Sequence, residues 1–193
     1  MESIPMHASP MHATSEHELT FERPGPGTYG EFYHPYIALV PDGDLRRLLP
    51  MIFDANYRAL RTIVPDLEQH RYAPGKWSIR EAVGHLSDAE RVFSYRALRV
   101  ARGDTTPLAS FDEGAFVREA RYDDIPLEQI LGELMAVHAS TILLFENLDD
   151  AAWDRIGTVS NHPMSVRALA YIIAGHELHH MNVLRERYGV MDF

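Results

Sequence analysis

Hydrophobic residues recur at helical spacing in four long segments, and each of these segments predicts an amphipathic helix. The segments run from about residue 44 to 64, 79 to 102, 126 to 148 and 163 to 187. Pro50 is expected to kink the first helix or to mark a restart. A short helix is expected around residues 113–119. Because no segment alternates like a strand, the pattern predicts an all-α protein built as a four-helix bundle.

The second helix has the clearest start signal in the chain. Ser78 and Glu81 stand in the positions of a capping box, and Trp77 precedes them at the position of a hydrophobic staple. Gly103 follows the last periodic residue and is expected to end the helix. This helix is therefore the best-defined element that the sequence predicts.

The first 30 residues differ from the rest of the chain. They show no hydrophobic period and end in the run Pro24–Gly27, which is typical of a loop. We expect residues 1–30 to form a flexible, poorly ordered N-terminal arm and residues 31–193 to form one bundle domain. The arm's histidines, His7, His12 and His17, have no framework to fix them and are not expected to bind a metal.

The amino-acid composition of the chain restricts its possible partners, location and metal ligands. The chain has 193 residues with 46% hydrophobic content, enough for one sizeable core. A formal net charge of −10 argues against nucleic acid as a partner. No run approaches the roughly 18 apolar residues of a membrane span, so a soluble protein is expected. The lack of a secretory signal and of any cysteine fits a cytoplasmic location, and any metal must be bound by nitrogen and oxygen ligands.

Near the C-terminus, residues His176–His180 read H-E-L-H-H, which matches the H-E-x-x-H pattern of zinc peptidases. On a helical wheel, His176 and His180 lie in the middle of the apolar face, whereas Glu177 and His179 lie on its flanks. Two imidazoles one turn apart on such a face need partners for their polar nitrogens. Metal ligation is the favoured interpretation, and a hydrogen-bonded core pair is the alternative.

A metal site needs a third ligand, and the peptidase pattern would take it from downstream. Residues after His180 offer no such histidine or carboxylate arrangement, so the ligand must lie upstream, at His85 or His138. Small neighbours, Ala82 and Ala89, leave space beside His85, whereas His138 sits among large apolar residues and is expected to be a satisfied core histidine. His85 is therefore the predicted third ligand.

Several short motifs together are similar to the DinB-like (YfiT-like) family of metal-dependent enzymes, over roughly residues 36–188. They are Trp77-Ser78-Ile79-Arg80-Glu81, Gly84-His85-Leu86, Glu90-Arg91-Val92-Phe93, Tyr95-Arg96-Ala97-Leu98, Arg102-Gly103-Asp104 and Gly175-His176-Glu177-Leu178-His179-His180. The resemblance implies a four-helix bundle that usually forms homodimers, with a divalent metal held by His85, His176 and His180. It follows that the peptidase pattern is accidental.

The resemblance also implies a reaction class. Relatives with this arrangement include transferases and isomerases that act on a small-molecule electrophile with a low-molecular-weight thiol, and the absence of cysteine agrees with a thiol supplied from outside. The alternatives are a metal-dependent hydrolase, with Asp88 or Glu177 as general base, and a bundle whose metal is purely structural. Zinc or nickel is the favoured ion, with iron as a further candidate.

Overall fold

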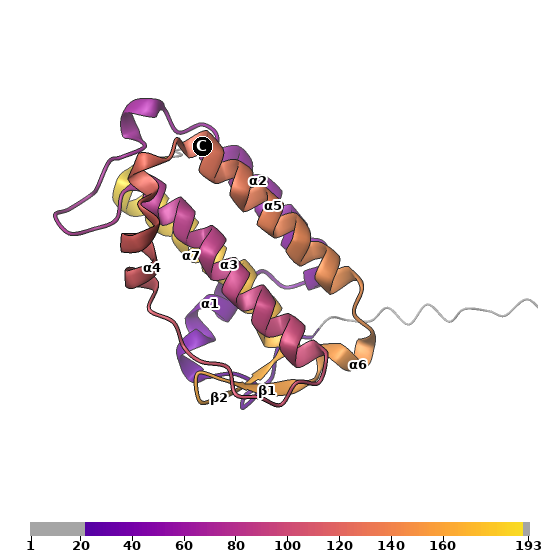
Figure 1. Cartoon of the computed structure of the whole chain (residues 1–193). Helices are drawn as coiled ribbons and strands as arrows, with labels where there is room; N and C mark the ends of the chain where they lie inside the picture. Colours follow the sequence, from indigo (N-terminus) through magenta and orange to yellow (C-terminus); the bar gives the residue numbers. More distant parts are fainter. Residues whose placement is uncertain (1–21, 191–193) are drawn as a thin grey trace, which may run out of the picture.

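Four long helices form the frame of the protein in the computed structural model, which describes residues 22–190 (Figure 1). They are α2 (Leu45–Leu60), α3 (Ile79–Ala101), α5 (Leu127–Glu146) and α7 (Val166–Tyr188). Helix α3 packs against both α5 and α7, and α2 packs against α5 and α7 from the other side. The predicted four-helix bundle is confirmed.

Short elements connect and cover these helices. They are α1 (His34–Leu39), α4 (Glu113–Ala120), α6 (Asp150–Trp153), the strands β1 (Ile156–Val159) and β2 (His162–Ser165), and the 3₁₀ turns Glu31–Tyr33, Pro65–Leu67 and Tyr122–Asp124. The two antiparallel strands correct the expectation that the chain has none. Each strand has only four residues, too few to give a readable alternation. The turn between them places Ser160 and Asn161 at positive φ, as tight hairpin turns require.

The helix ends follow local chemistry. The predicted capping box is present, because Glu81 N donates to Ser78 Oγ at 3.0 Å and Ser78 N donates to Glu81 Oε2 at 2.8 Å. Helix α2 runs through Pro50, so the expected alternative of a restart there is wrong. Leu49 and Phe53, buried on either side of Pro50, hold the helix to the core. It ends at Leu60 and not at Val64, since a residue that precedes a proline disfavours helical geometry.

Residues 22–30, the end of the expected arm, are packed on the body. Arg23 Nη1 donates to the carbonyl of Ile37 at 2.8 Å, and its Nε donates to Asp42 Oδ1 at 3.1 Å. Ser165 N at the end of β2 donates to the carbonyl of Thr28 at 2.8 Å. Residues 22–30, which were expected to be the end of the flexible arm, therefore belong with the bundle domain. His7, His12 and His17 lie outside the described residues.

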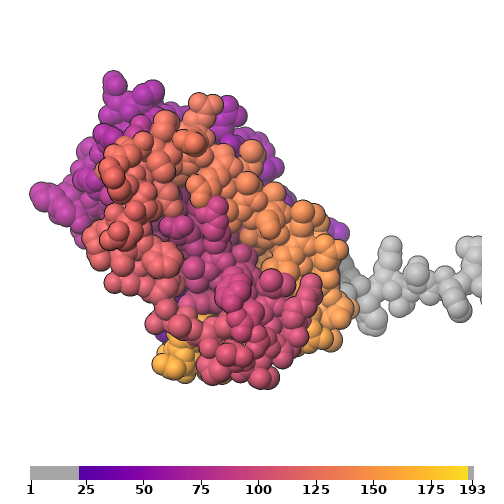
Figure 2. All heavy atoms as spheres, viewed as in Figure 1, coloured from indigo at the N-terminus to yellow at the C-terminus, as the bar shows by residue number. Residues whose placement is uncertain are grey.

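Helix α5 presents an apolar outer surface. Met135 and Leu143 are 49% and 59% exposed. Figure 2 shows α3 (magenta) and α5 (salmon to orange) together on one face of the molecule. Within the part of the chain that the structure describes, α5 is also the one helix long and apolar enough to cross a membrane. Core helices of soluble bundles often have the same length and apolar composition. Its inner face packs against α2 and α3, so α5 is a bundle helix here.

One close approach places α1 next to the start of the H-E-x-x-H segment. A Cβ atom at Gly175 would lie 2.0 Å from the carbonyl oxygen of Tyr36, so only glycine allows the two backbones to meet. The contact sets the ring of Tyr36 5.5 Å from that of His176 and 5.3 Å from that of His179. Gly175 is therefore a packing residue that positions one wall of the histidine cluster.

This approach yields a test of the fold. Gly175→Ala should lower the free energy of unfolding by roughly 2 kcal/mol, because the added methyl group overlaps backbone atoms that cannot move independently. Gly132→Ala is the matched control, since a Cβ at Gly132 in α5 meets nothing within 4 Å. The control should raise stability by up to about 1 kcal/mol through higher helix propensity. Urea denaturation of both variants checks this, and a neutral Gly175→Ala would contradict the packing of α1 on α7.

Candidate metal centre

Three imidazoles meet between α3 and α7. His85 comes from α3, and His176 and His180 come from consecutive turns of α7. His85 Nε2 lies 3.1 Å from His176 Nε2, which lies 3.2 Å from His180 Nε2. One ligand atom from each of the three residues lies within 4.8 Å of the other two. We call these three residues the histidine cluster.

Helix geometry and small residues explain why the cluster forms. Residues four positions apart lie one above the other on a helix, so His176 and His180 point to the same side of α7. On α3, Ala82 and Ala89 flank His85 and are buried, which lets the two helices approach closely. The sequence prediction that His85, and not His138, meets the α7 pair matches this geometry.

The apolar surroundings keep the cluster uncharged. Burial lowers the pKa of His85 to about 4. Burial, followed by repulsion from the neighbouring imidazoles, holds the pKa values of His176 and His180 well below their ordinary range. All three rings are therefore neutral at pH 7, which is the form of imidazole that binds a metal ion.

The cluster fits a divalent metal ion. Three Nε2 atoms converge, yet each neutral imidazole has only one N–H group, so mutual hydrogen bonds cannot satisfy them all. Within residues 22–190, these three side chains are also the one group of histidine and carboxylate residues whose ligand atoms gather closely enough. Three imidazoles leave at least one coordination position open, which is typical of catalytic sites.

Aromatic rings surround the cluster. The ring of Trp77 lies 4.8 Å from that of His85 and 6.4 Å from that of His180. The ring of Phe93 lies 5.7 Å from that of His176. These rings exclude water and lower the local dielectric, which strengthens electrostatic interactions inside the site.

Glu113 is a site residue that the sequence analysis misses. It begins α4, and its Oε2 lies 4.0 Å from His85 Nε2, while its side chain remains 63% exposed. The pKa values of Tyr33 and Tyr36 are raised by burial and also by the negative charge of Glu113, which places this carboxylate among the groups around the cluster. The N-cap at Asp112 is visible in the sequence, but only the fold brings α4 against α3.

The two predicted general bases have other partners. Asp88 Oδ2 accepts a hydrogen bond from Tyr122 Oη at 2.8 Å. Glu177 is 6% exposed, and its Oε1 accepts a hydrogen bond from Asn56 Nδ2 of α2 at 2.9 Å. Burial raises the pKa of Glu177 to about 7. Each carboxylate thus accepts a hydrogen bond from a residue of another secondary-structure element, and neither belongs to the histidine cluster.

His138 lies in the core between α2 and α3, as the sequence analysis favours. Its ring stacks on Phe53 with centroids 3.9 Å apart, and its Nδ1 lies 3.0 Å from Glu90 Oε1. His138 therefore has a carboxylate partner of its own and takes no part in the cluster.

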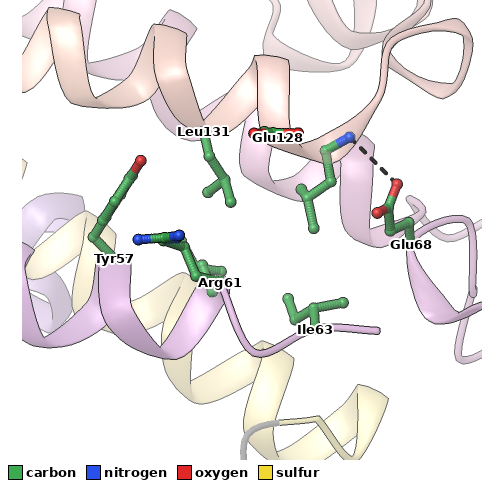
Figure 3. Close-up of a pocket in the computed structure, with 8 residues that line it drawn as sticks. Tyr57, Arg61, Ile63, Glu68, Glu128 and Leu131 are labelled. Carbon is green, nitrogen blue, oxygen red and sulfur yellow. Dashed lines mark hydrogen bonds between the residues drawn. The ribbon is translucent and has the colours of Figure 1, made fainter. Parts of the chain in front are cut away.

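A separate pocket of about 300 Å³ lies between α2 and the start of α5 (Figure 3). Its walls include Tyr57, Arg61 and Leu131, and the backbone N–H of Leu127 donates to Glu68 Oε2 there at 3.3 Å. None of the three clustered histidines lines it, so this pocket is not part of the candidate centre.

The cluster yields a test of the ligands. His85→Ala, His176→Ala and His180→Ala should each reduce the bound zinc per protein at least tenfold, because each removes one of three convergent nitrogens. His179→Ala and His138→Ala are the controls, one on the flank of α7 and one in the core, and both should retain zinc. Metal analysis of protein purified without nickel affinity resin measures this, and equal loss from His179→Ala would mean that α7 is rotated.

The buried carboxyl of Glu177 yields a pH test. Between its ordinary pKa of 4.5 and its folded value of about 7, the folded protein keeps a proton that the unfolded chain releases. Stability therefore falls as pH rises through that window. Glu177→Gln keeps an acceptor for Asn56 but removes the charge. In metal-free protein, its stability relative to wild type should be higher at pH 8 than at pH 5 by roughly 2 kcal/mol. A pH-independent difference between the two proteins would contradict the burial of Glu177.

Known proteins share this architecture. The solved structure of YfiT from Bacillus subtilis, described as a probable metal-dependent hydrolase with an unusual four-helix bundle topology, superposes with a TM-score of 0.65 at 18% identity. The match covers 88% of this chain and 94% of YfiT. A curated protein of Geobacillus thermodenitrificans (strain NG80-2), named "Putative metal-dependent hydrolase", is 26% identical over 140 residues, which are 68% of this chain and 79% of that protein.

The family is shown by a match that includes most of the bundle. The model of the DinB superfamily matches residues 52–184, from the middle of α2 to the last turns of α7. The matched region contains all three clustered histidines and the helices that carry them. The resemblance noted from the sequence motifs is thereby confirmed, and the chain belongs to the DinB superfamily.

Proposed function

We propose that the protein is a metal-dependent hydrolase of small molecules in which His85, His176 and His180 hold a divalent ion. The observation that carries the proposal is the carboxylate of Glu113, exposed to solvent and 4.0 Å from His85 Nε2 at the edge of three neutral imidazoles. The name of the Geobacillus relative supports the same reaction class.

The chain's own residues have defined tasks in such a reaction. A divalent ion in the cluster would polarise the scissile carbonyl group and lower the pKa of a water molecule. Glu113 accepts the proton of the attacking water, because its carboxylate is close to the cluster and open to solvent. It then returns that proton to the leaving group. Trp77, Tyr36 and Phe93 orient the substrate and exclude other water molecules.

This assignment differs from a peptidase mechanism. In an H-E-x-x-H peptidase the glutamate of the motif is the general base, which here would be Glu177. Glu177 instead faces Asn56 of α2 from within the core. Its orientation supports the interpretation that the peptidase pattern is accidental and that the histidine spacing serves the metal alone.

Thiol transfer is the second candidate. The 193 residues contain no cysteine, so a transferase of this kind must take its thiol from a low-molecular-weight cosubstrate, and the same imidazoles would serve it. Zinc, nickel and iron all accept imidazole ligands, and the choice among them stays a prediction. So do the cytoplasmic location and the homodimer, for which the exposed Met135 and Leu143 of α5 offer an apolar surface.

Glu113→Gln tests the proposed function. In zinc-loaded protein it should lower the turnover of a small ester such as 4-nitrophenyl acetate by about 100-fold while bound zinc stays constant, because it removes the proton acceptor and spares the ligands. Glu119→Gln, on the exposed side of the same helix, is the matched control and should leave turnover unchanged.

Two other outcomes would overturn this proposal. Full activity in Glu113→Gln with loss in Glu177→Gln would restore the peptidase interpretation. Product formation that requires added glutathione, with no hydrolysis in its absence, would favour the thiol-dependent transferase.

A further inference from the structure

A pocket of about 340 Å³ adjoins the histidine cluster on the side of the loop that precedes α3. We call it the Trp77 pocket, and its lining residues are Tyr72, Gly75, Lys76, Trp77, Ala82, His179, His180, Val183 and Tyr188. The volume is in the range of sites that bind small molecules. His180 belongs both to the cluster and to this lining, so a molecule in the pocket reaches the candidate metal centre directly.

The walls of the Trp77 pocket are held in place by contacts between distant segments. Tyr188 Oη, near the end of α7, donates a hydrogen bond to the carbonyl of Trp77 at 2.7 Å. The ring of Tyr72 packs edge-on against that of Tyr188, with centroids 4.8 Å apart. Trp77 lies nearly parallel to the imidazole of His180, at an interplanar angle of 18°. The pocket is therefore formed before any ligand binds, and its aromatic surfaces suit a flat apolar group.

The Trp77 pocket carries a positive charge at one position of its lining. Lys76 is its one lysine or arginine, and no aspartate or glutamate lines it, although the chain carries 28 acidic residues and a net charge of −10. The Lys76 ammonium lies 5.9 Å from the ring centre of Tyr72 and has no carboxylate partner within residues 22–190. An exposed ammonium beside an apolar wall attracts an anionic group on a bound molecule.

From these observations we infer that the Trp77 pocket binds a small aromatic carboxylate, with the ring between Trp77 and Tyr72 and the carboxylate at Lys76. The placement of the reacting bond rests on the proposed function: the end of the molecule opposite the carboxylate is directed toward His180. The substrates of the site are therefore aromatic acids that carry a hydrolysable bond on the side away from the carboxylate.

Binding can be measured without turnover. The chain has two tryptophans, and Trp153 lies outside the pocket, so Trp153→Phe makes Trp77 the single fluorescent reporter. Zinc-loaded Trp153→Phe protein is titrated with phenylacetate and with its neutral analogue, phenylacetamide. Phenylacetate should change Trp77 fluorescence and bind about tenfold more tightly than the amide, the ratio expected for a charge-assisted hydrogen bond.

Lys76→Met in the same background identifies the anion partner. It should abolish the preference for the carboxylate and leave the affinity for phenylacetamide within twofold, because the methionine keeps the apolar stem. Arg118→Met is the matched control, because Arg118 is an exposed cation that lines the neighbouring pocket but not the Trp77 pocket, and it should keep the tenfold preference.

Two results would overturn the inference. The first is an unchanged Trp77 signal with both probes. The second is a carboxylate preference that survives Lys76→Met, which would mean that zinc itself holds the carboxylate. Since the titration needs no catalysis, a protein that binds phenylacetate as expected but hydrolyses no ester would contradict the proposed function alone. A protein that hydrolyses esters but shows no Lys76-dependent binding would contradict this inference alone.

Discussion

The packing of α3 against α7 is the contact on which the site depends. It brings His85 to within 3.1 Å of His176 in an apolar interior, where burial keeps the imidazoles neutral. Buried polar nitrogens without full hydrogen bonding are costly, and the three converging Nε2 atoms cannot all be satisfied by one another. A divalent ion would offset this cost by binding the convergent nitrogens. The packing of α3 against α7 thus determines both the stability of the bundle and the formation of the candidate metal site.

Other buried polar groups explain why this contact has one orientation. Asn56 holds Glu177 on the α2 side of α7, and Glu90 holds His138 on the inner side of α5. A rotation of α7 that moved its histidines away from α3 would also separate Glu177 from Asn56. These pairs therefore fix the rotation of the helices and leave the clustered histidines facing one another.

The sequence predicts the parts of the site that depend on local geometry. The spacing of His176 and His180 places both on one helix face whatever the fold, and the small neighbours of His85 distinguish it from His138. Glu113 could not be found in this way, because its place beside His85 depends on how a long connection folds back across α3. Likewise, the helical wheel places Glu177 on a flank of its helix. It cannot reveal that Asn56, 121 positions away in the sequence, donates a hydrogen bond to Glu177. The hairpin of β1 and β2 could not be predicted, because strands of four residues are too short to show an alternating pattern.

The central claim is that three imidazoles from two helices hold one divalent ion with a position open for substrate. X-ray absorption at the zinc edge of the zinc-loaded protein tests it most directly, because imidazole rings give a characteristic scattering pattern. The account predicts three imidazole nitrogens at about 2.0–2.1 Å, together with at least one oxygen ligand from solvent. A zinc ion bound by fewer than three imidazoles would contradict it.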